Sequence, residues 1–173
     1  MDDQSLLLLG ILKVQSQHGY QINEFIEKNL SRVTNMKKAT AYATLERLAK
    51  AGYVTVTFEQ EGNRPQRKVY SITSMGEEYF IEQLRENLAL AEQMTFTGDI
   101  GLMFLDNLPR PEVAQLLKMR LADVEKQIAS FEKAPFHANG HGVNLAVAHV
   151  LTLFKSEQKW LLATIPELES VTQ

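Results

Sequence analysis

Apolar residues in the first fifty positions recur at helical spacing and predict three helices. Residues 5–14 are almost entirely apolar and indicate a buried first helix. A turn follows at His18-Gly19-Tyr20. The apolar face of a second helix is then Tyr20, Ile22, Phe25, Ile26 and Leu30. A third helix is predicted from an N-cap at Asn35 to about Ala51. Its buried face is Ala41, Leu45 and Leu48, and Gly52 ends it.

The hydrophobic period changes to two after Gly52. Residues 53–59 and 67–73 alternate as two strands do, and residues 60–66 between them are rich in turn-forming types. The sequence therefore predicts a β-hairpin. Three helices followed by a hairpin is the order of a winged helix-turn-helix domain. In such a domain the third helix enters the major groove, about 12 Å wide, and the hairpin touches the flanking backbone.

Helical patterns return after the hairpin. Ser74-x-x-Glu77 matches a capping box and predicts a fourth helix that runs to about Met94. Phe96, Ile100 and Phe104 then indicate a short amphipathic helix that ends before Pro109. Pro111 suits the first turn of the next helix.

Two longer apolar stripes follow, separated by a loop at residues 134–142. The first is Val113, Leu117, Leu121, Val124, Ile128 and Phe131, and the second is Val147, Leu151, Phe154, Gln158, Leu161 and Ile165. Such stripes pack helix on helix, within one chain or across a dimer. We favour the dimer because a small winged helix usually needs two half-sites. The expected organisation is a DNA-binding domain at 1–93 and a helical dimerisation domain at 94–173, a mostly α chain with one small hairpin.

Charge is unevenly distributed along the chain. The formal net charge is −3, yet residues 28–68 hold nine Lys and Arg against three Glu. Because charges act within a Debye length of roughly 8–10 Å, a locally basic segment can bind a polyanion in an acidic protein. An ordinary mixed-charge surface is the alternative interpretation of charge alone.

Composition limits the other classes of function. The 45% hydrophobic content is that of a globular protein, and the absence of cysteine excludes disulfides and fits a reducing cytoplasm. The N-terminus lacks the pattern of a signal peptide. We find no nucleophile elbow, phosphate-binding glycine loop or metal-ligand helix, and therefore expect neither enzymatic activity nor a cofactor.

The candidate DNA contacts lie in the third helix and the hairpin. In and before the helix they are Lys37, Lys38, Thr40, Tyr42, Ala43, Thr44 and Arg47, and in the hairpin Arg64, Arg67 and Lys68. Lysines and hydroxyls can meet phosphates, whereas Arg47 can meet a phosphate or a guanine edge. The alternatives are an ion pair of Arg47 with a glutamate on a neighbouring turn, a packing role for Tyr42 and a solvated charged hairpin.

Two further groups of residues deserve an interpretation. His137, His141 and His149 have the side chains of a transition-metal site, but the first two lie in the predicted loop, and solvated histidines explain them better. Met103, Met119, Phe154 and Trp160 can line an apolar ligand cavity or simply form core.

Residues 5–80 resemble the PadR-type transcriptional regulators. The resemblance is carried by residues 6–12, His18-Gly19-Tyr20, Ala39-Thr40-Ala41-Tyr42 through Leu45, Arg47-Leu48, Gly52 and Arg64-Pro65-x-Arg67-Lys68-x-Tyr70-x-Ile72-Thr73-x-x-Gly76. The sequence departs from the family pattern at Ala43, where proline is common, and at Ala41, where a larger aliphatic residue is common. The long second half is similar to the larger subgroup of the family.

The resemblance implies a dimeric, cytoplasmic, usually repressing DNA-binding protein whose C-terminal helices form the dimer. Some members respond to phenolic or other apolar compounds, so a small effector is expected as a possible partner. The sequence thus predicts a homodimer on an inverted repeat, with its two third helices roughly 34–36 Å apart. The alternative is a winged-helix adaptor that binds protein and no DNA; the basic helix and hairpin favour DNA.

Overall fold

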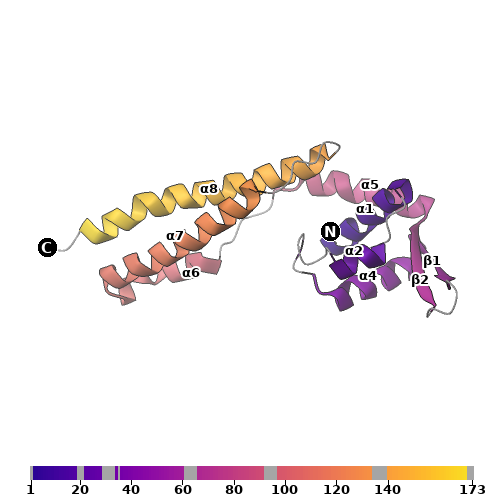
Figure 1. Ribbon diagram of the computed structural model, residues 1–173, viewed down its shortest axis with the longest axis horizontal. Coiled ribbons are helices and arrows are strands. Elements are labelled where there is room, and N and C mark those ends of the chain that lie inside the picture. Colours follow the sequence, from indigo (N-terminus) through magenta and orange to yellow (C-terminus); the bar gives the residue numbers. More distant parts are fainter. Residues whose placement is uncertain are drawn as a thin grey trace. The chain divides into compact units, whose positions relative to one another are not determined.

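The computed structural model describes residues 2–18, 22–28, 34, 36–60, 66–91, 97–133 and 140–170. The chain divides into two compact units, Met1–Gln93 and Met94–Gln173. The first contains helices and a hairpin, and the described part of the second is helical (Figure 1). The chain is therefore mostly α with a small antiparallel hairpin, which confirms the predicted fold class.

Three helices form the core of the first unit. They are α1 (Asp3–His18), α2 (Ile22–Lys28) and α4 (Lys38–Lys50), which lie together in Figure 1. Their buried apolar side chains are Leu8, Leu9, Leu12, Ile22, Ile26, Ala41, Leu45 and Leu48. The predicted apolar faces are confirmed at these positions. Burying such side chains contributes about 1.5–3 kcal/mol each, so this cluster fixes how α4 lies on α1 and α2.

The end of α4 depends on Gly52. This residue has φ +82°, a left-handed conformation that glycine adopts at low cost. Its N–H donates to the Ala49 carbonyl, and the Tyr53 N–H donates to the Leu48 carbonyl, both at 3.0 Å. These two bonds form a Schellman motif, which satisfies carbonyls left free at the helix end. The prediction that Gly52 ends the helix is confirmed.

The start of α4 differs from the prediction. The helix begins at Lys38 with Lys37 at its N-cap, so the N-cap predicted at Asn35 was wrong. Lys37 makes no side-chain capping bond. Asn35 itself lies outside the described residues. The Met36 N–H donates instead to the Thr34 hydroxyl at 3.2 Å, a local turn ahead of the helix.

The hairpin consists of β1 (Val54–Glu59) and β2 (Arg67–Ile72), paired antiparallel from Val54 with Ile72 to Glu59 with Arg67. Val54 and Tyr70 are buried against the three-helix core. The strand ends nearest the turn are exposed. The predicted hairpin is confirmed, and we call it the wing.

Helix α5 (Ser74–Ala89) packs against α1, and its N-cap is one residue earlier than predicted. The Thr73 hydroxyl accepts from the Gly76 N–H at 3.0 Å and donates to the Gly52 carbonyl at 2.8 Å. The N-cap predicted at Ser74 was therefore wrong, because Thr73 alone has a second partner. The helix also ends at Ala89 rather than near Met94, since Leu90 is extended.

The second unit is built on two long helices, α7 (Arg110–Glu132) and α8 (His141–Ser170). They pack along each other through Val113, Leu117, Val124, Ile128, Leu161 and Ile165. Before them lie α6 (Thr97–Met103) and the 3₁₀ turn η1 (Leu105–Asn107). The two predicted stripes are confirmed at these buried positions. Ile100 and Phe104 are exposed, so the predicted short helix buries neither within the chain. Helix α8 also takes in His141 and Gly142, which were predicted as loop.

Candidate nucleic-acid interface

One face of α4 is exposed on the first unit. It consists of Ala39, Ala43, Glu46 and Lys50, which recur at helical spacing. The opposite face, with Ala41, Leu45 and Leu48, is buried in the core. Small side chains at two of the exposed positions leave the helix backbone close to any surface that it meets. We call these four positions the outer face of α4.

The predicted helix contacts lie on different sides of α4. Lys37, Lys38, Ala43 and Arg47 are exposed, and Thr40 and Tyr42 are half-buried. Burial and the nearby Glu27 carboxylate raise the pKa of the Tyr42 hydroxyl, which keeps it a neutral hydrogen-bond donor. Thr44 is 4% exposed, and its hydroxyl donates to Gln4 Oε1 at 3.4 Å. Thr44 therefore faces α1, and its burial removes it from the set of expected contacts.

Two of the three predicted hairpin contacts belong to β2. Arg67 and Lys68 are exposed there, and Arg64 lies outside the described residues. The Asn23 Nδ2 of α2 donates to the Lys68 carbonyl at 2.7 Å, a bond that ties the turn end of β2 to the helices. The strand that carries Lys68 is thus held against α2. Tyr42, Glu46, Arg67 and Lys68 line one open groove of about 620 Å³ between the helices and the wing.

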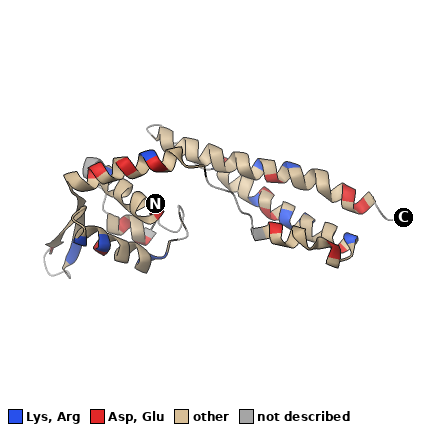
Figure 2. Ribbon diagram, turned by 180° about the vertical axis from the view of Figure 1, so that it is seen from behind, with Lys and Arg blue, Asp and Glu red and all other residues tan. Residues whose placement is uncertain are grey.

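Carboxylates neutralise most of the described cations in this region. Figure 2 shows basic and acidic positions side by side in the first unit. The pairs are Lys38 with Glu27, Arg47 with Asp2, Arg67 with Glu59 at 3.4 Å and Lys68 with Glu46 at 2.8 Å. Exposed pairs of this kind contribute little to stability and exchange readily. The side chains can therefore turn to a phosphate, but each must first give up a carboxylate.

The pair of Glu46 and Lys68 links α4 to the wing. A hydrogen bond from Lys68 lowers the pKa of the Glu46 carboxyl, and the same bond raises the pKa of Lys68. Both groups are therefore charged at neutral pH. A carboxylate on the outer face repels DNA phosphates, and its lysine partner offsets that repulsion.

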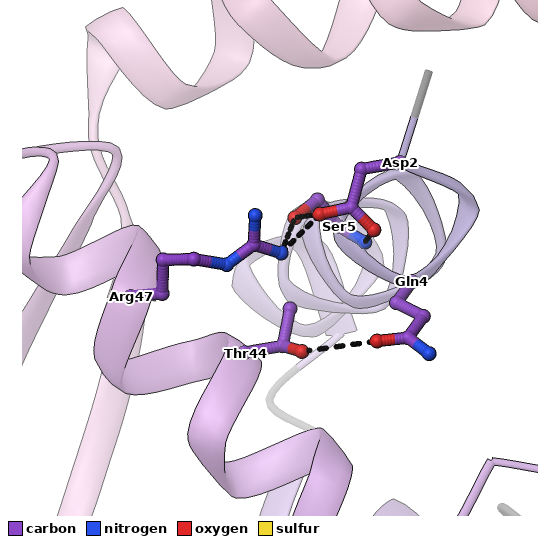
Figure 3. Close-up of polar contacts among 5 residues, drawn as sticks. All are labelled: Asp2, Gln4, Ser5, Thr44 and Arg47. Carbon is purple, nitrogen blue, oxygen red and sulfur yellow. Dashed lines mark hydrogen bonds and ion pairs between the residues drawn. The ribbon is translucent and has the colours of Figure 1, made fainter.

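Arg47 and Asp2 form the second link, between α4 and the start of α1 (Figure 3). Arg47 Nη2 also donates to the Ser5 hydroxyl at 3.2 Å. Burial disfavours the Asp2 carboxylate, but the hydrogen bonds from Arg47 and Ser5 outweigh it and lower the pKa of Asp2. The alternative pairing of Arg47 with a glutamate on a neighbouring turn was wrong in its partner, because Arg47 pairs with Asp2 at the start of α1.

Sequence reasoning missed four residues of this surface, of which Ala39 is one. Glu46 and Lys50 share the outer face with Ala43, a relation that counting three and four positions along the helix reveals. Asp2 lies 45 positions from Arg47, and no local pattern connects them.

The residues predicted for an apolar ligand cavity do not lie together. Phe154 lines a cleft of about 330 Å³ between α7 and α8, with Arg120, Val124, Val150, Leu153 and Glu157. Met103 and Met119 are 77% and 62% exposed and do not line it. Trp160 lies beside the cleft, with its ring 6.0 Å from the Arg120 guanidinium. Arg120 Nη2 is 2.6 Å from Glu157 Oε1, although the angles are not those of a hydrogen bond.

The described residues include neither a group of metal ligands nor a membrane-spanning helix. His141 and His149 are exposed on α8, and His137 lies outside the described residues. No group of three or more potential ligands capable of holding a metal ion occurs in the ranges that the structure covers. In the same ranges, no helix has the length and apolar character needed to cross a bilayer.

These features define a winged helix-turn-helix protein, with an exposed α4 and a wing whose β2 strand carries two cations. Residues 8–82 match the Transcriptional regulator PadR-like family, so this segment of the chain is a PadR-like domain. Transcription regulation and DNA binding are the functions of this class. Over 165 residues the chain is 24% identical to the negative transcriptional regulator PadR of Bacillus subtilis, covering 89% of this chain and 91% of that one.

Solved structures share the fold. The crystal structure of B. subtilis PadR in complex with operator DNA has a TM-score of 0.75 at 19% identity, covering 94% of this chain and 98% of that chain. The same protein in complex with p-coumaric acid has a TM-score of 0.72 at 18% identity, covering 98% and 99%. A PadR-like regulator of Bacillus cereus, BC1756, has a TM-score of 0.65 at 16% identity, covering 96% and 98%.

Proposed function

We propose that this protein is a repressor that binds an inverted-repeat operator as a homodimer, with one α4 helix in each major groove. The observation that carries the proposal is the outer face of α4, where Ala39 and Ala43 permit close approach to base edges. The proposed helix contacts are Lys37, Lys38, Thr40, Tyr42, Ala43 and Arg47, and those of the wing are Arg64, Arg67 and Lys68. The B. subtilis PadR structure with operator DNA supports this assignment.

A protein-binding adaptor is the alternative function, and the charges argue against it. Cations lie at both ends of the proposed surface, at Lys37 and Lys38 where α4 begins and at Arg67 and Lys68 on the wing. Phosphates flank a major groove on both sides, which matches this arrangement. An adaptor surface has no comparable need for cations at both places.

A second copy of the chain is the proposed partner of the second unit. Large apolar side chains are exposed there on α6, α7 and the turn between them: Ile100, Met103, Phe104, Leu116 and Met119. Several large exposed apolar side chains on consecutive elements are typical of an interface. Two copies joined in this way supply the two half-sites that an inverted repeat requires.

A small aromatic effector is the second proposed ligand. The cleft at Phe154 has apolar walls and one ion pair, of Arg120 with Glu157, at its edge. The B. subtilis PadR structure with p-coumaric acid supports an aromatic ligand. Titration calorimetry with p-coumaric acid should give saturable binding to the wild type, weakened at least about tenfold in Phe154→Ala. Equal heats from both proteins would contradict this site.

Selection from a random duplex library tests the DNA-binding proposal. The wild type should enrich a palindromic sequence, bind it at nanomolar concentration and lose affinity steeply between 50 and 200 mM salt, as phosphate-binding proteins typically do. Light scattering on the same sample should give a dimer. Enrichment of no sequence, with no mobility shift on any genomic fragment, would leave the adaptor as the better account.

Replacing Glu46 by glutamine should strengthen DNA binding without regard to sequence. The change removes a negative charge from the outer face and frees Lys68 for a phosphate. We expect affinity for the selected duplex and for an unrelated duplex to rise by about two- to fivefold, the modest gain that a change of one exposed charge gives. Fluorescence anisotropy at several salt concentrations measures both. The control is Glu78→Gln on α5, which makes the same charge change away from the proposed DNA-binding surface. It should leave both affinities unaltered.

A further inference from the structure

Lys50 is the cation of the outer face of α4. It lies seven positions after Ala43 and eleven after Ala39. Because an α-helix turns by about 100° per residue, these three side chains leave the helix within about 40° of one another. Lys50 is exposed, whereas Leu48 in the same turn is buried in the core. The ammonium group therefore belongs to the side of α4 on which the two alanines permit close approach.

Lys50 also differs from the other cations of this region in having no carboxylate partner. Among the described cations on α4 and the wing, only Lys37 and Lys50 make no ion pair. Lys37 is the N-cap residue and has an extended backbone, so it lies before the helix and not on its outer face. Lys50 can thus meet a phosphate without first giving up a carboxylate.

The wing keeps the nearest carboxylate away from Lys50. Glu46 lies four positions before Lys50, a spacing at which glutamate and lysine often pair along a helix. Here the Glu46 carboxylate instead accepts from Lys68 Nζ of β2 at 2.8 Å. The bond from Lys68 is the main cause of the lowered pKa of Glu46, and the charge of Lys50 contributes least to it. The ion pair between α4 and the wing therefore leaves Lys50 uncompensated.

The position of Lys50 along α4 suits a phosphate better than a base. At about 1.5 Å per residue, Lys50 lies about 10 Å along the helix axis from Ala43, in the last turn. The major groove is about 12 Å wide, so a helix that crosses it with Ala43 near the middle brings Lys50 to its border, where the phosphates are. Lysine carries a compact charge on a flexible stem and lacks the planar fork with which arginine recognises a guanine.

We propose that Lys50 binds a phosphate at the border of the major groove and contributes more to DNA affinity than Lys68 does, an inference that rests on the proposed DNA binding. Lys50 then positions α4 on the duplex without reading its sequence. Its contribution should be the same on every duplex.

The variants Lys50→Gln and Lys68→Gln test the proposal in the full-length protein. Each removes one positive charge, and glutamine has nearly the helix propensity of lysine. Affinity is measured by fluorescence anisotropy at several salt concentrations, on the duplex selected by the wild type and on an unrelated one. Lys50→Gln should weaken binding to both by roughly tenfold and lower the slope of log affinity against log salt by about 0.9 for each protomer bound. Lys68→Gln should lower both values less, because Lys68 must release Glu46 first.

Two control variants separate charge from structure. Lys50→Arg keeps the charge and should retain the affinity and the salt slope of the wild type. Arg85→Gln removes an exposed cation of α5 that makes no ion pair in the described part of the chain, and it should leave the slope unaltered. Circular dichroism melting of each variant ensures that affinities are compared between folded proteins.

Duplexes that carry a single methylphosphonate locate the contact, because this group replaces one charged phosphate by a neutral one. The wild type should lose affinity when the phosphate bound by Lys50 is neutralised in either half-site. Lys50→Gln should bind that modified duplex as well as the unmodified one, while it remains sensitive to methylphosphonates at other contacted positions.

Other outcomes would overturn the inference. If Lys50→Gln binds DNA as Arg85→Gln does, Lys50 is a solvated residue that only favours the helix C-terminus. If it weakens the selected duplex alone, Lys50 contacts a base. If Lys68→Gln costs more affinity, the ion pair with Glu46 does not decide which lysine binds DNA. A wild type that binds no duplex contradicts the proposed function instead, and that result is visible before any variant is made.

Discussion

Replacing Ala43 by glutamate should lower the affinity for the selected duplex by at least about a hundredfold. Ala43 is exposed at the middle of the outer face of α4, so the new carboxylate would stand among base edges and phosphates. Like charges brought together across an interface cost several kcal/mol, and each ~1.4 kcal/mol is a factor of ten. The new side chain also lies four residues before Arg47, a spacing that favours ion pairing along a helix and would withdraw the arginine from DNA.

The stability of the Ala43→Glu variant should be almost unchanged. Glutamate is a good helix former, and surface substitutions usually alter the free energy of unfolding by less than about 0.5 kcal/mol. Titration by anisotropy and thermal melting together separate the two effects. Ala89→Glu, at the exposed end of α5, is the control and should bind almost as well as the wild type. Equal loss in both variants, or none in either, would place the DNA surface elsewhere.

Replacing Gly76 by alanine should produce the largest loss of stability. A Cβ at this position would lie 2.1 Å from the Tyr53 carbonyl oxygen, far inside van der Waals contact. That carbonyl cannot easily recede, because it accepts from the Thr73 N–H at 3.0 Å and the Tyr53 ring stacks on Tyr79 at 4.4 Å. We expect a loss of about 3 kcal/mol or more, at the upper end for overpacking. For a unit of this size the melting temperature should fall by at least about 12 °C.

Gly142→Ala is the matched control, since both glycines lie in the first turn of a helix. A Cβ at Gly142 would meet nothing within 4 Å, so this variant should melt at the wild-type temperature or slightly above it. DNA affinity should fall only in Gly76→Ala, because the wing is attached at Tyr53 and Thr73. If both variants melt alike, the contact between Gly76 and Tyr53 does not support the hairpin.

The sequence predicts the parts of the fold that local chemistry decides. Helical spacing of apolar residues identifies α1, α2, α4 and the long pair α7 and α8, and the change of period at Gly52 identifies the hairpin. Gly52 itself is predictable because few other residues adopt a left-handed conformation at low cost. These features depend on neighbours within a few positions.

Errors arise where a distant contact decides between local alternatives. Thr73 and Ser74 are equally good caps in sequence, and only the Gly52 carbonyl, placed by the fold, distinguishes them. The buried side chain of Thr44 and the partner of Arg47 both depend on contacts at the start of α1, 40 and 45 positions away. The same reason explains the unexpected neutralisation of the wing cations. Charge counting along residues 28–68 reveals a basic segment, whereas the carboxylates that offset it come from several elements.

Methylation interference on the selected duplex tests the central claim most directly. Dimethyl sulfate modifies guanine N7, an atom that only a ligand in the major groove can touch. If each protomer places α4 in a major groove, methylation should block binding at two clusters of guanines whose centres are about 10–10.5 base pairs, or one helical turn, apart. Binding that tolerates methylation at every guanine, or interference confined to a single cluster, would contradict a dimer that reads two half-sites through α4.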